Sequence, residues 1–332
     1  VKATLRKEGF FMIYNNILEL IGNTPLVKIN KLNPNLKVTL LAKLEFFNPG
    51  GSIKDRIGLT MIESAEKRKK LIRNGVIVEA TGAGNTGLGL IMTAAVKGYK
   101  TILVIPDKVS GEKRNLLRAY GAKVVVAPTA VPPENERSYY KVTEKLVKET
   151  PNVFHPNQYF NPDNPKTHFQ TTGPEIWKQT KGKITHVVVG MGTGGTITGI
   201  GKFLKKKNPD IKIIGVDSIG SIYYEYFKTG KYKNALKTWK MEGIGEDFIP
   251  KTMDFSIVDQ VIPVSDKQAF LTARELAKSE GILSGGTSGA ALYAAQKLVK
   301  KLKRGLVVII FPDSGRSYLS KFYNDDWMRS NI

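Results

Sequence analysis

Short apolar segments alternate with helix-like segments along almost the whole chain, and this alternation restricts the fold more than any other feature. In the segment Ser52–Leu71, Ile53, Ile57, Met61 and Ala65 fall on one helical face. Strands are predicted at Val38–Phe46, Val76–Ala80, Thr101–Ile105, Lys123–Ala127, His186–Val189, Lys212–Val216 and Leu306–Phe311. Helices are predicted at Ser52–Leu71, Thr86–Gly98, Ser110–Tyr120, Tyr140–Glu149, Thr172–Thr180, Thr196–Lys207, Lys267–Glu280 and Thr287–Lys303. Because repeated β–α–β units form parallel sheets covered by helices, the sequence predicts an α/β protein.

The length of 332 residues predicts two lobes, each a mostly parallel sheet flanked by helices. The boundary is expected in the irregular stretch Pro151–Pro165. Residues 1–11 are expected to be a loose tail, because the patterned part begins at Met12. In folds of this kind, ligands bind at the carboxyl ends of strands, in the loops that lead into helices.

The composition excludes several classes of protein. The chain has no cysteine, which excludes disulfides, thiolate metal sites and a cysteine nucleophile. Its three histidines, His155, His168 and His186, are too widely spaced to predict a metal site. The apolar run Leu306–Phe311 is far too short to span a membrane, and the N-terminus lacks the pattern of a signal peptide. These features predict a cytoplasmic protein without a metal.

The net charge of +22 permits two interpretations. One is a nucleic-acid-binding protein, and the other is a lysine-rich, solvated surface. Most of the lysine groups end apparent helices, where cations suit the helix dipole, and no zinc-finger or RNP-type pattern accompanies them. The solvated surface is therefore the preferred interpretation.

The first loop that can carry chemistry, here named the lysine loop, is Asn48–Arg56, with the sequence Asn-Pro-Gly-Gly-Ser-Ile-Lys-Asp-Arg. Ser52 is expected to cap the following helix, and Asp55 to complete a capping box. Lys54 then lies in the first helical turn, where the positive end of the helix and burial lower the pKa of its amine. A neutral amine there can form a Schiff base with a carbonyl cofactor. The alternative is one exposed lysine among many.

Two glycine-rich loops each lie between a strand and a helix. Thr81–Gly87, named the small-lobe loop, offers backbone N–H groups, the Asn85 amide and two threonine hydroxyls to a carboxylate. Gly190–Thr196, named the phosphate loop, has the composition of a phosphate cradle. It also matches G-x-G-x-x-G, with Asp217 about 20 residues further on, so a dinucleotide-binding oxidoreductase is an alternative.

A fourth loop, Ser284–Gly289, opens a predicted helix. Thr287 or Ser288 either caps that helix or donates a neutral hydroxyl to a heteroaromatic nitrogen. Together the four loops offer an amine nucleophile, a carboxylate nest, a phosphate cradle and a hydroxyl, a set that suits pyridoxal 5′-phosphate and an amino acid. A neutral partner at the ring nitrogen weakens the electron sink, and this favours loss of a β-substituent over racemisation.

With these loops in place, the sequence resembles the cysteine synthase/cystathionine β-synthase family, which are tryptophan synthase β-like pyridoxal-phosphate enzymes of fold type II. The resemblance covers about residues 16–330. It is carried by Gly22–Leu26, Asn48–Arg56, Asn157-Gln158, Asn161–Pro165, Thr171–Ile176, Gly192–Thr196 and Gly243–Gly245. The cystathionine β-synthase branch is the closer match for Glu242–Pro250, Phe311–Tyr318 and Lys321–Met328, whereas Thr171–Trp177 looks more like the cysteine synthase branch. The resemblance implies a bacterial-type catalytic core and a homodimer, without the haem segment and regulatory pair of larger members.

The resemblance also assigns roles to residues. Lys54 would carry the internal aldimine and transfer protons, Asn85 would contact the cofactor's 3′-oxygen, and Thr287 would face the ring nitrogen. The phosphate would be bound by Gly192, Thr193, Gly194, Gly195 and Thr196. The substrate carboxylate would be held by Gln158 and the small-lobe loop (Thr81, Gly82, Ala83 and Thr86), and Gly243 would belong to the loop that closes over the amine. The family's common loop reads Thr-Ser-Gly-Asn-Thr-Gly, so the loop here is one residue longer and lacks the serine.

By the same resemblance, residues 12–48 plus 160–332 form a large cofactor-binding domain, and residues 49–159 form a small mobile domain. The expected reaction is β-replacement on serine, O-acetylserine or cysteine, through an aminoacrylate, with a thiol or sulfide as acceptor. Its products would be cysteine, cystathionine or lanthionine, with hydrogen sulfide released if cysteine is the donor. Glu246 and Asp247 either tune the second substrate or belong to a solvated loop. The alternative functions are a nicotinamide-dependent oxidoreductase that uses Gly190–Gly195 and a nucleic-acid-binding protein.

Overall fold

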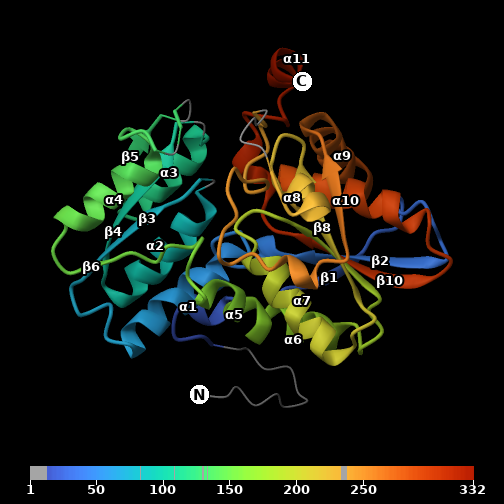
Figure 1. Cartoon of the computed structure of the whole chain (residues 1–332), viewed down its shortest axis with the longest axis horizontal. Helices are drawn as coiled ribbons and strands as arrows, with labels where there is room; N and C mark the ends of the chain where they lie inside the picture. The colour runs from blue at the N-terminus through green and yellow to red at the C-terminus, as the bar shows by residue number, and fades with distance from the viewer. Residues whose placement is uncertain (1–12, 83, 108, 129–130, 133, 233–237) are drawn as a thin grey trace.

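A computed structural model describes residues 13–332 except 83, 108, 129–130, 133 and 233–237, and it contains two sheets (Figure 1). The larger sheet has the order β1-β2-β10-β7-β8-β9, and only β1 runs antiparallel to its neighbour. Its strands are β1 (Leu26–Lys28), β2 (Val38–Leu44), β7 (His186–Gly190), β8 (Lys212–Ser218), β9 (Gln260–Val264) and β10 (Gly305–Phe311). The smaller, all-parallel sheet has the order β5-β4-β3-β6. Its strands are β3 (Val76–Ala80), β4 (Lys100–Pro106), β5 (Lys123–Ala127) and β6 (Val153–Phe154).

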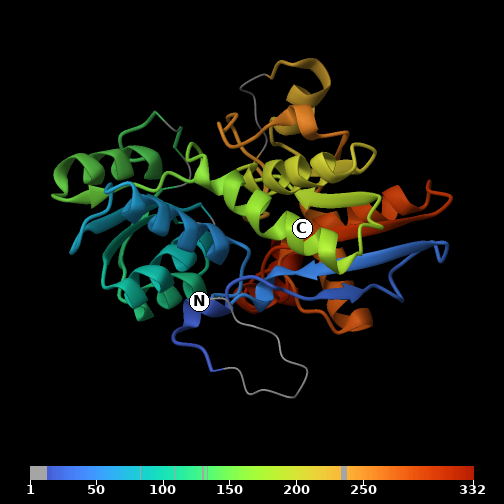
Figure 2. The same ribbon diagram turned by 90° about the horizontal axis from the view of Figure 1, so that it is seen from below.

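Helices cover both sheets, and Figures 1 and 2 show the two lobes side by side. Helices of the smaller lobe are α1 (Lys54–Lys67), α2 (Asn85–Lys97), α3 (Gly111–Ala119) and α4 (Tyr139–Glu149). Those of the larger lobe are α5 (Asp163–Gln170), α6 (Thr172–Gln179), α7 (Gly195–Lys207), α8 (Tyr223–Thr229), α9 (Asp266–Glu280), α10 (Gly286–Val299) and α11 (Asp325–Asn331). Four short 3-10 helices are η1 (Ile17–Leu20), η2 (Glu45–Phe47), η3 (Phe255–Ile257) and η4 (Gly315–Tyr318).

The larger sheet buries both of its faces, because successive side chains of a strand point to opposite sides. Val188 and Ile214 pack into one core with α9 and α10. Val187 and Ile213 pack into a second core on the other face, with α6 and α7. This double burial explains why these strands are continuous apolar runs in the sequence.

Helix α1 joins the two lobes. Three residues of its predicted apolar face, Ile57, Met61 and Ala65, lie in the core of the smaller lobe. Ile53, just before the helix, packs instead into the α6–α7 core of the larger lobe. The start of α1, where Lys54 lies, is thus fixed at the junction between the lobes.

The predicted α/β fold is confirmed, with several local corrections. The strand predicted to Phe46 ends at Leu44, because η2 follows it, and the helix predicted to Lys303 ends at Val299. The stretch 151–165, expected to be irregular, contains β6 and the first turn of α5. The predictions did not include β1, β9, α8 and α11. The predicted tail, residues 1–11, lies outside the described residues. Among the helices that are described, none has the length and apolarity needed to cross a membrane.

Candidate active site

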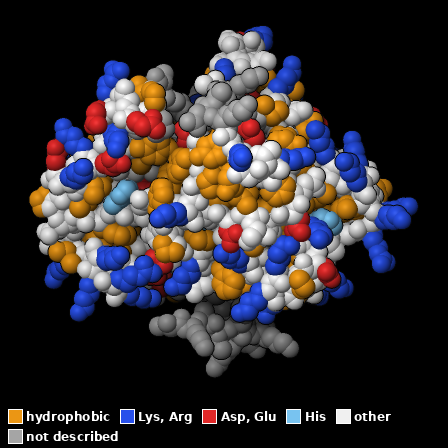
Figure 3. Space-filling view, in the orientation of Figure 1, with side chains coloured by type: hydrophobic (Ala, Val, Ile, Leu, Met, Phe, Trp, Pro, Cys, Tyr) orange, Lys and Arg blue, Asp and Glu red, His pale blue; other side chains and the backbone are white. Residues whose placement is uncertain are grey.

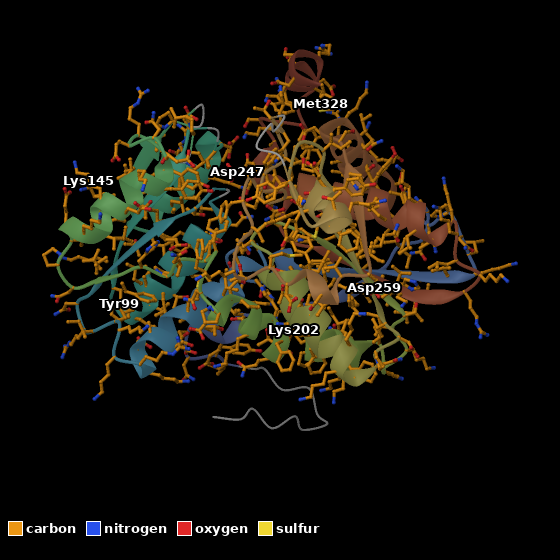
Figure 4. All side chains as sticks on the ribbon, viewed as in Figure 1. Tyr99, Lys145, Lys202, Asp247, Asp259 and Met328 are labelled. Carbon is orange, nitrogen blue, oxygen red and sulfur yellow. The ribbon has the colours of Figure 1, made fainter. Side chains whose placement is uncertain are left out.

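A cavity of about 190 Å³ lies where strands β3, β7 and β10 end. Asp247 is part of its lining, and Figure 4 shows Asp247 between the two lobes. Predicted site residues that line it are Lys54, Thr81, Gly82, Asn85, Thr86, Gln158, Gly192, Thr193, Gly243 and Thr287. Gly194 and Thr196 line an adjoining recess, which shares Lys54, Thr193 and Thr287 with the cavity. Gly195 lines neither, and Ala83 lies outside the described residues. The four loops therefore converge, as expected for the carboxyl ends of parallel strands.

Lys54 is the first residue of α1, and its Nζ lies 3.4 Å from Thr193 Oγ1 of the phosphate loop. Burial lowers the pKa of its amine to about 8, and the negative charge of Glu246 opposes this shift. A lower pKa increases the neutral, nucleophilic fraction of the amine near neutral pH. Lys54 thus has the environment that its loop predicts.

The predicted capping box is wrong. The helix begins two residues later than predicted, with Ile53 as its N-cap, and among the described residues no side chain caps it. Ser52 Oγ accepts instead from the N–H of Lys54 at 3.2 Å. Asp55 Oδ2 accepts from the N–H of Gly50 at 2.6 Å, so it holds the Pro-Gly-Gly turn.

A buried ion cluster fixes the start of α1, and no sequence pattern predicted it. The Arg56 guanidinium lies 2.7 Å from a carboxylate oxygen of Glu45 and 2.7 Å from one of Glu175. Lys43 Nζ lies 2.8 Å from the other oxygen of Glu175. Although burial would raise it, the bonds from Arg56 and Lys43 lower the pKa of Glu175 to about 2. Buried charges compensated in this way hold Lys54 in place.

The phosphate loop is tightly packed around its glycines. Gly194 is the N-cap of α7 and has a φ of 81°. A Cβ added at Gly194 would lie 2.5 Å from Met253 Cβ, and one at Gly195 would lie 1.9 Å from Asn164 Oδ1. At Gly192, an added Cβ would lie 2.6 Å from the carbonyl oxygen of Gly243. The loop therefore has no space for side chains at these glycines, and it lies at a helix N-terminus, where a phosphate binds well.

Two threonines of the phosphate loop are held by buried partners. Thr193 Oγ1 accepts from Asn164 Nδ2 at 3.1 Å. Thr196 Oγ1 lies 3.3 Å from Nε2 of His168. Burial holds the pKa of His168 well below its ordinary value, so the ring is neutral. Both hydroxyls are thus oriented by the larger lobe.

The small-lobe loop is fixed through Gln158. Thr86 Oγ1 donates to Gln158 Oε1 at 2.6 Å, and Gln158 Nε2 donates to the Ala80 carbonyl at 3.2 Å. Glu79 accepts from the N–H of Gln158 at 3.0 Å, and burial raises the pKa of Glu79 to about 7. This arrangement holds the Gln158 amide and the Thr86 hydroxyl in the wall of the cavity that Lys54 also lines.

Asn85 and Thr287 both line the cavity but have partners that the sequence did not indicate. Asn85 Nδ2 donates to Asp313 Oδ2 at 2.9 Å, which leaves its second amide hydrogen for a ligand. Thr287 Oγ1 donates to the Glu242 carbonyl at 3.0 Å. Neither Thr287 nor Ser288 caps α10, because its N-cap is Gly285 and no side-chain cap bond is found among the described residues. The capping interpretation of these two residues is therefore wrong.

A network around Asp313 and Glu242 joins the lobes next to the cavity. Asp313 Oδ2 also accepts from the Tyr318 hydroxyl at 2.6 Å. Lys113, on α3, donates to that hydroxyl at 2.8 Å and lies 3.1 Å from a carboxylate oxygen of Glu242. The sequence signals for these residues were two motifs of the resemblance, Glu242–Pro250 and Phe311–Tyr318, and neither indicated that they form a network.

Asp217 does not support the dinucleotide alternative. Asp217 is buried near the end of β8. Its carboxylate accepts from the N–H groups of Ser218 at 2.9 Å and Tyr224 at 2.8 Å. It does not line the cavity. This buried carboxylate holds the backbone of β8 and of the first turn of α8, away from the cavity, so it is not placed to bind a ribose there.

The loops fit pyridoxal phosphate. The phosphate loop provides a cradle that a Cβ would fill at Gly192, Gly194 and Gly195. Lys54 reaches Thr193 of this cradle, and Asn85 and Thr287 line the same cavity. Among the described residues, no group of three His, Asp or Glu side chains could hold a metal ion.

Known proteins match nearly the whole chain. A family model described as pyridoxal-phosphate dependent enzyme matches residues 17–313. Proteins named cystathionine beta-synthase are similar, with 44% identity over 321 residues for Dictyostelium discoideum and 47% over 319 residues for Mus musculus. These matches cover 96% and 95% of this chain, but 64% and 56% of the relatives. The chain thus spans less than two thirds of the length of these curated relatives.

A solved structure is also similar. A hydrogen sulfide-producing enzyme from Fusobacterium nucleatum has a TM-score of 0.85 and 39% identity, covering 92% of this chain and 100% of that one. The resemblance expected from the motifs is confirmed by these matches. The chain belongs to the pyridoxal-phosphate dependent enzymes of fold type II.

Proposed function

We propose that the protein catalyses β-replacement on an amino acid, with a thiol or sulfide as acceptor. The observation that carries this proposal is the position of Lys54, whose amine lies 3.4 Å from Thr193 of the phosphate loop, in a cavity that the small-lobe loop also lines. The relatives named cystathionine beta-synthase support this reaction class. The similarity to the hydrogen sulfide-producing enzyme of Fusobacterium nucleatum supports hydrogen sulfide as a product when cysteine is the donor.

Each part of the cavity has a task in this reaction. Gly192–Thr196 would hold the cofactor's phosphate, Asn85 would face its 3′-oxygen and Thr287 its ring nitrogen. Bound pyridoxal phosphate supplies the electron sink for reaction at the donor's α-carbon. Gln158 and the small-lobe loop, including Thr81, Gly82 and Thr86, would hold the donor carboxylate, with Gly243 near its amine.

Lys54 would move the protons. Its amine, with a pKa of about 8, would take the α-proton of the donor and later return a proton to that carbon. The bond from the β-carbon to the leaving group breaks, and a bond from the β-carbon to the acceptor sulfur forms. The displaced group leaves with the thiol proton, so no oxidant or reductant is needed. The donor would be serine, O-acetylserine or cysteine, and the product cysteine, cystathionine or lanthionine.

The lobes and the assembly also have proposed roles. Residues 49–159 would move as a small domain against 12–48 plus 160–332, and Gly243 would belong to the closing segment. The protein would act as a cytoplasmic homodimer. Exposed apolar side chains of η1 and the edge strand β1, namely Ile17, Leu20 and Val27, suit an interface.

The test is the variant Lys54→Ala, with Lys145→Ala as control because the Lys145 side chain is 73% exposed. Purified proteins are incubated with pyridoxal phosphate, each donor and each thiol, and thioether and sulfide are quantified by mass spectrometry and a sulfide assay. We expect Lys54→Ala to lose turnover by about 10³-fold or more, with an unchanged circular dichroism spectrum. Turnover at the wild-type rate in Lys54→Ala would exclude the proposed role.

A further inference from the structure

Asp313 is a buried carboxylate at the cavity that has no task in the proposed reaction. It lies two residues after the end of β10, lines the cavity, and is only 5% exposed. Burial of a carboxylate is costly unless neighbouring groups compensate it. The contacts of Asp313 therefore indicate what this buried charge does.

The backbone around Asp313 is bonded to two of the loops that form the cavity. The N–H of Ile53, in the lysine loop, donates to the carbonyl of Pro312 at 2.8 Å. The N–H of Gly285, in the loop that leads into α10, donates to the carbonyl of Asp313 at 3.0 Å. Asp313 is thus fixed relative to both of these loops.

The two carboxylate oxygens of Asp313 face different neighbours. Oδ2 accepts from Asn85 Nδ2 at 2.9 Å and from the Tyr318 hydroxyl at 2.6 Å. Oδ1 lies against Gly285, where an added Cβ would be 1.9 Å away, and it has no hydrogen-bond partner among the described residues. The carboxylate therefore reaches the small-lobe loop through Oδ2, and it holds the nitrogen end of the Asn85 amide.

A lysine of the smaller lobe supports the charge of Asp313. Lys113, on α3, donates to the Tyr318 hydroxyl at 2.8 Å and lies 3.1 Å from a carboxylate oxygen of Glu242. Lysines and arginines are spread over the face shown in Figure 3, whereas the Lys113 side chain is only 4% exposed. Burial raises the pKa of Asp313, and the positive charge of Lys113 opposes this shift. Lys113 thus favours the ionised form of Asp313, which only accepts hydrogen bonds.

The orientation of the Asn85 amide decides what it can offer to a ligand. Asn85 is the first residue of α2 and lines the cavity. Its amide has one oxygen that accepts and one nitrogen that donates two hydrogens. With one hydrogen bound by Asp313, the second N–H is left for the cavity. Without an acceptor at Asp313, half a turn about the Cβ–Cγ bond would exchange the oxygen and the nitrogen.

We propose that Asp313 is a positioning residue that holds the Asn85 amide with its second N–H directed at the cofactor's 3′-oxygen. The inference deepens the proposed function and rests on its cofactor-binding part. A hydrogen bond donated to this oxygen stabilises the ionised form of the oxygen. Pyridoxal phosphate on an enzyme absorbs at longer wavelength when this oxygen is ionised. Asp313 acts on the cofactor through Asn85 alone.

The experiment is a double-mutant cycle on cofactor binding, with wild type, Asn85→Ala, Asp313→Ala and the double variant. The Kd for pyridoxal phosphate is measured by equilibrium dialysis, without amino-acid donor or thiol. We expect each single variant to raise the Kd about five- to tenfold, because each removes the same directed hydrogen bond. The double variant should have the Kd of Asn85→Ala to within about twofold, since two residues that act as one unit are not additive.

The visible spectrum of the loaded protein gives a second readout that does not depend on turnover. Both single variants and the double variant should lose long-wavelength absorbance of the bound cofactor to the same extent. The matched control is Asp259→Ala, because the Asp259 carboxylate also accepts a hydrogen bond, from the N–H of Ile213 at 2.8 Å. Asp259 lies just before β9, at the edge of the larger sheet opposite the cavity. This variant should leave the Kd and the spectrum unchanged.

The outcomes decide the inference separately from the reaction. Losses in Kd that multiply in the double variant would show that Asp313 acts independently of Asn85 and would overturn the inference. A wild-type Kd in Asp313→Ala would also overturn it. If Asp313→Ala fails to fold, Asp313→Asn takes its place with the same two criteria, because its amide can present either end to Asn85. A protein that completes the cycle as expected but forms neither thioether nor sulfide would keep this inference and lose the proposed reaction.

Discussion

The small-lobe loop and the phosphate loop follow the same plan. Each connects a parallel strand to a helix, and each has a glycine N-cap in the left-handed region, with a φ of 77° at Gly84 and 81° at Gly194. Two residues later, each has a threonine that contacts a buried polar side chain. Thr86 donates to Gln158, and Thr196 lies within hydrogen-bonding distance of His168. Local geometry is therefore not what distinguishes their proposed ligands.

The two loops differ in how closely other residues surround them. A Cβ at Gly194 would lie 2.6 Å from the backbone Cα of Met253, while one at Gly84 would lie 3.6 Å from the flexible Lys113 side chain. At Gly82, the nearest described atoms would be the hydroxyl oxygens of Tyr139 and Tyr159, at 3.7 and 3.8 Å. The phosphate loop is thus crowded at every glycine, whereas the small-lobe loop has space at Gly82 and Gly84 and is crowded at Gly87, where an added Cβ would lie 2.9 Å from Thr81 Cγ2. The open part of the small-lobe loop is where an extra residue can be accommodated.

Variants of the two N-cap glycines, Gly84 and Gly194, give the strongest test of the difference in packing between the loops. Gly84→Ala places a Cβ in the left-handed region without crowding, and should lower the free energy of unfolding by about 1–2 kcal/mol. Gly194→Ala adds overpacking against Met253 to the same strain, and should lower it by about 2–5 kcal/mol. Urea denaturation of both cofactor-free variants, beside wild type, measures the difference. Equal losses would show that the phosphate loop is no more constrained than the small-lobe loop.

Variants of the two threonines test whether the loops bind different ligands, and their expected effects are smaller. Thr196→Val removes a hydroxyl beside the proposed phosphate site, and should raise the Kd for pyridoxal phosphate about tenfold. Thr86→Val leaves Gln158 Oε1 without its 2.6 Å donor, and should raise the KM for the amino-acid donor by a similar factor. Equilibrium dialysis of the cofactor and steady-state kinetics give the two constants for each variant. Variants that change the same constant would contradict separate ligands for the loops.

The sequence predicted those parts of the fold and the site that depend on local patterns of residues. The strand–helix alternation and the glycine-rich loops are local patterns, and they singled out Lys54, Asn85 and Thr287, which line one cavity. Gln158, which lines the same cavity, was indicated only by the family resemblance. The convergence needed only the rule that parallel strands end at the same edge of a sheet. The edge strand β9 was missed because it contains Pro263, which breaks the expected strand pattern.

Contacts between distant segments could not be predicted in this way. The hydrogen bond from Asn85 to Asp313 joins residues 228 positions apart, and that from Lys113 to Glu242 joins residues 129 positions apart. No periodicity or spacing links such pairs, because they meet only after both lobes have folded. The same holds for Met253, which leaves no space for a Cβ at Gly194 of the phosphate loop. The difference between the two loops is thus a property of tertiary packing.

The variant with the smallest expected effect tests whether the small-lobe loop has space at Gly82. Gly82→Ser restores the hydroxyl of the family's common loop, and the added Cβ would have only ordinary contacts with Tyr139 and Tyr159. We expect the free energy of unfolding to change by less than about 0.5 kcal/mol. If Gly82 faces the donor carboxylate, the new hydroxyl should lower the KM for the donor about two- to threefold, since one added hydrogen bond contributes about 0.5–1.5 kcal/mol before the cost of ordering it. Gly82→Ala is the control, because it adds the Cβ without the hydroxyl and should leave KM near the wild-type value. A large loss of stability in either variant would mean that the small-lobe loop is packed as rigidly as the phosphate loop, and its extra residue would then need another explanation.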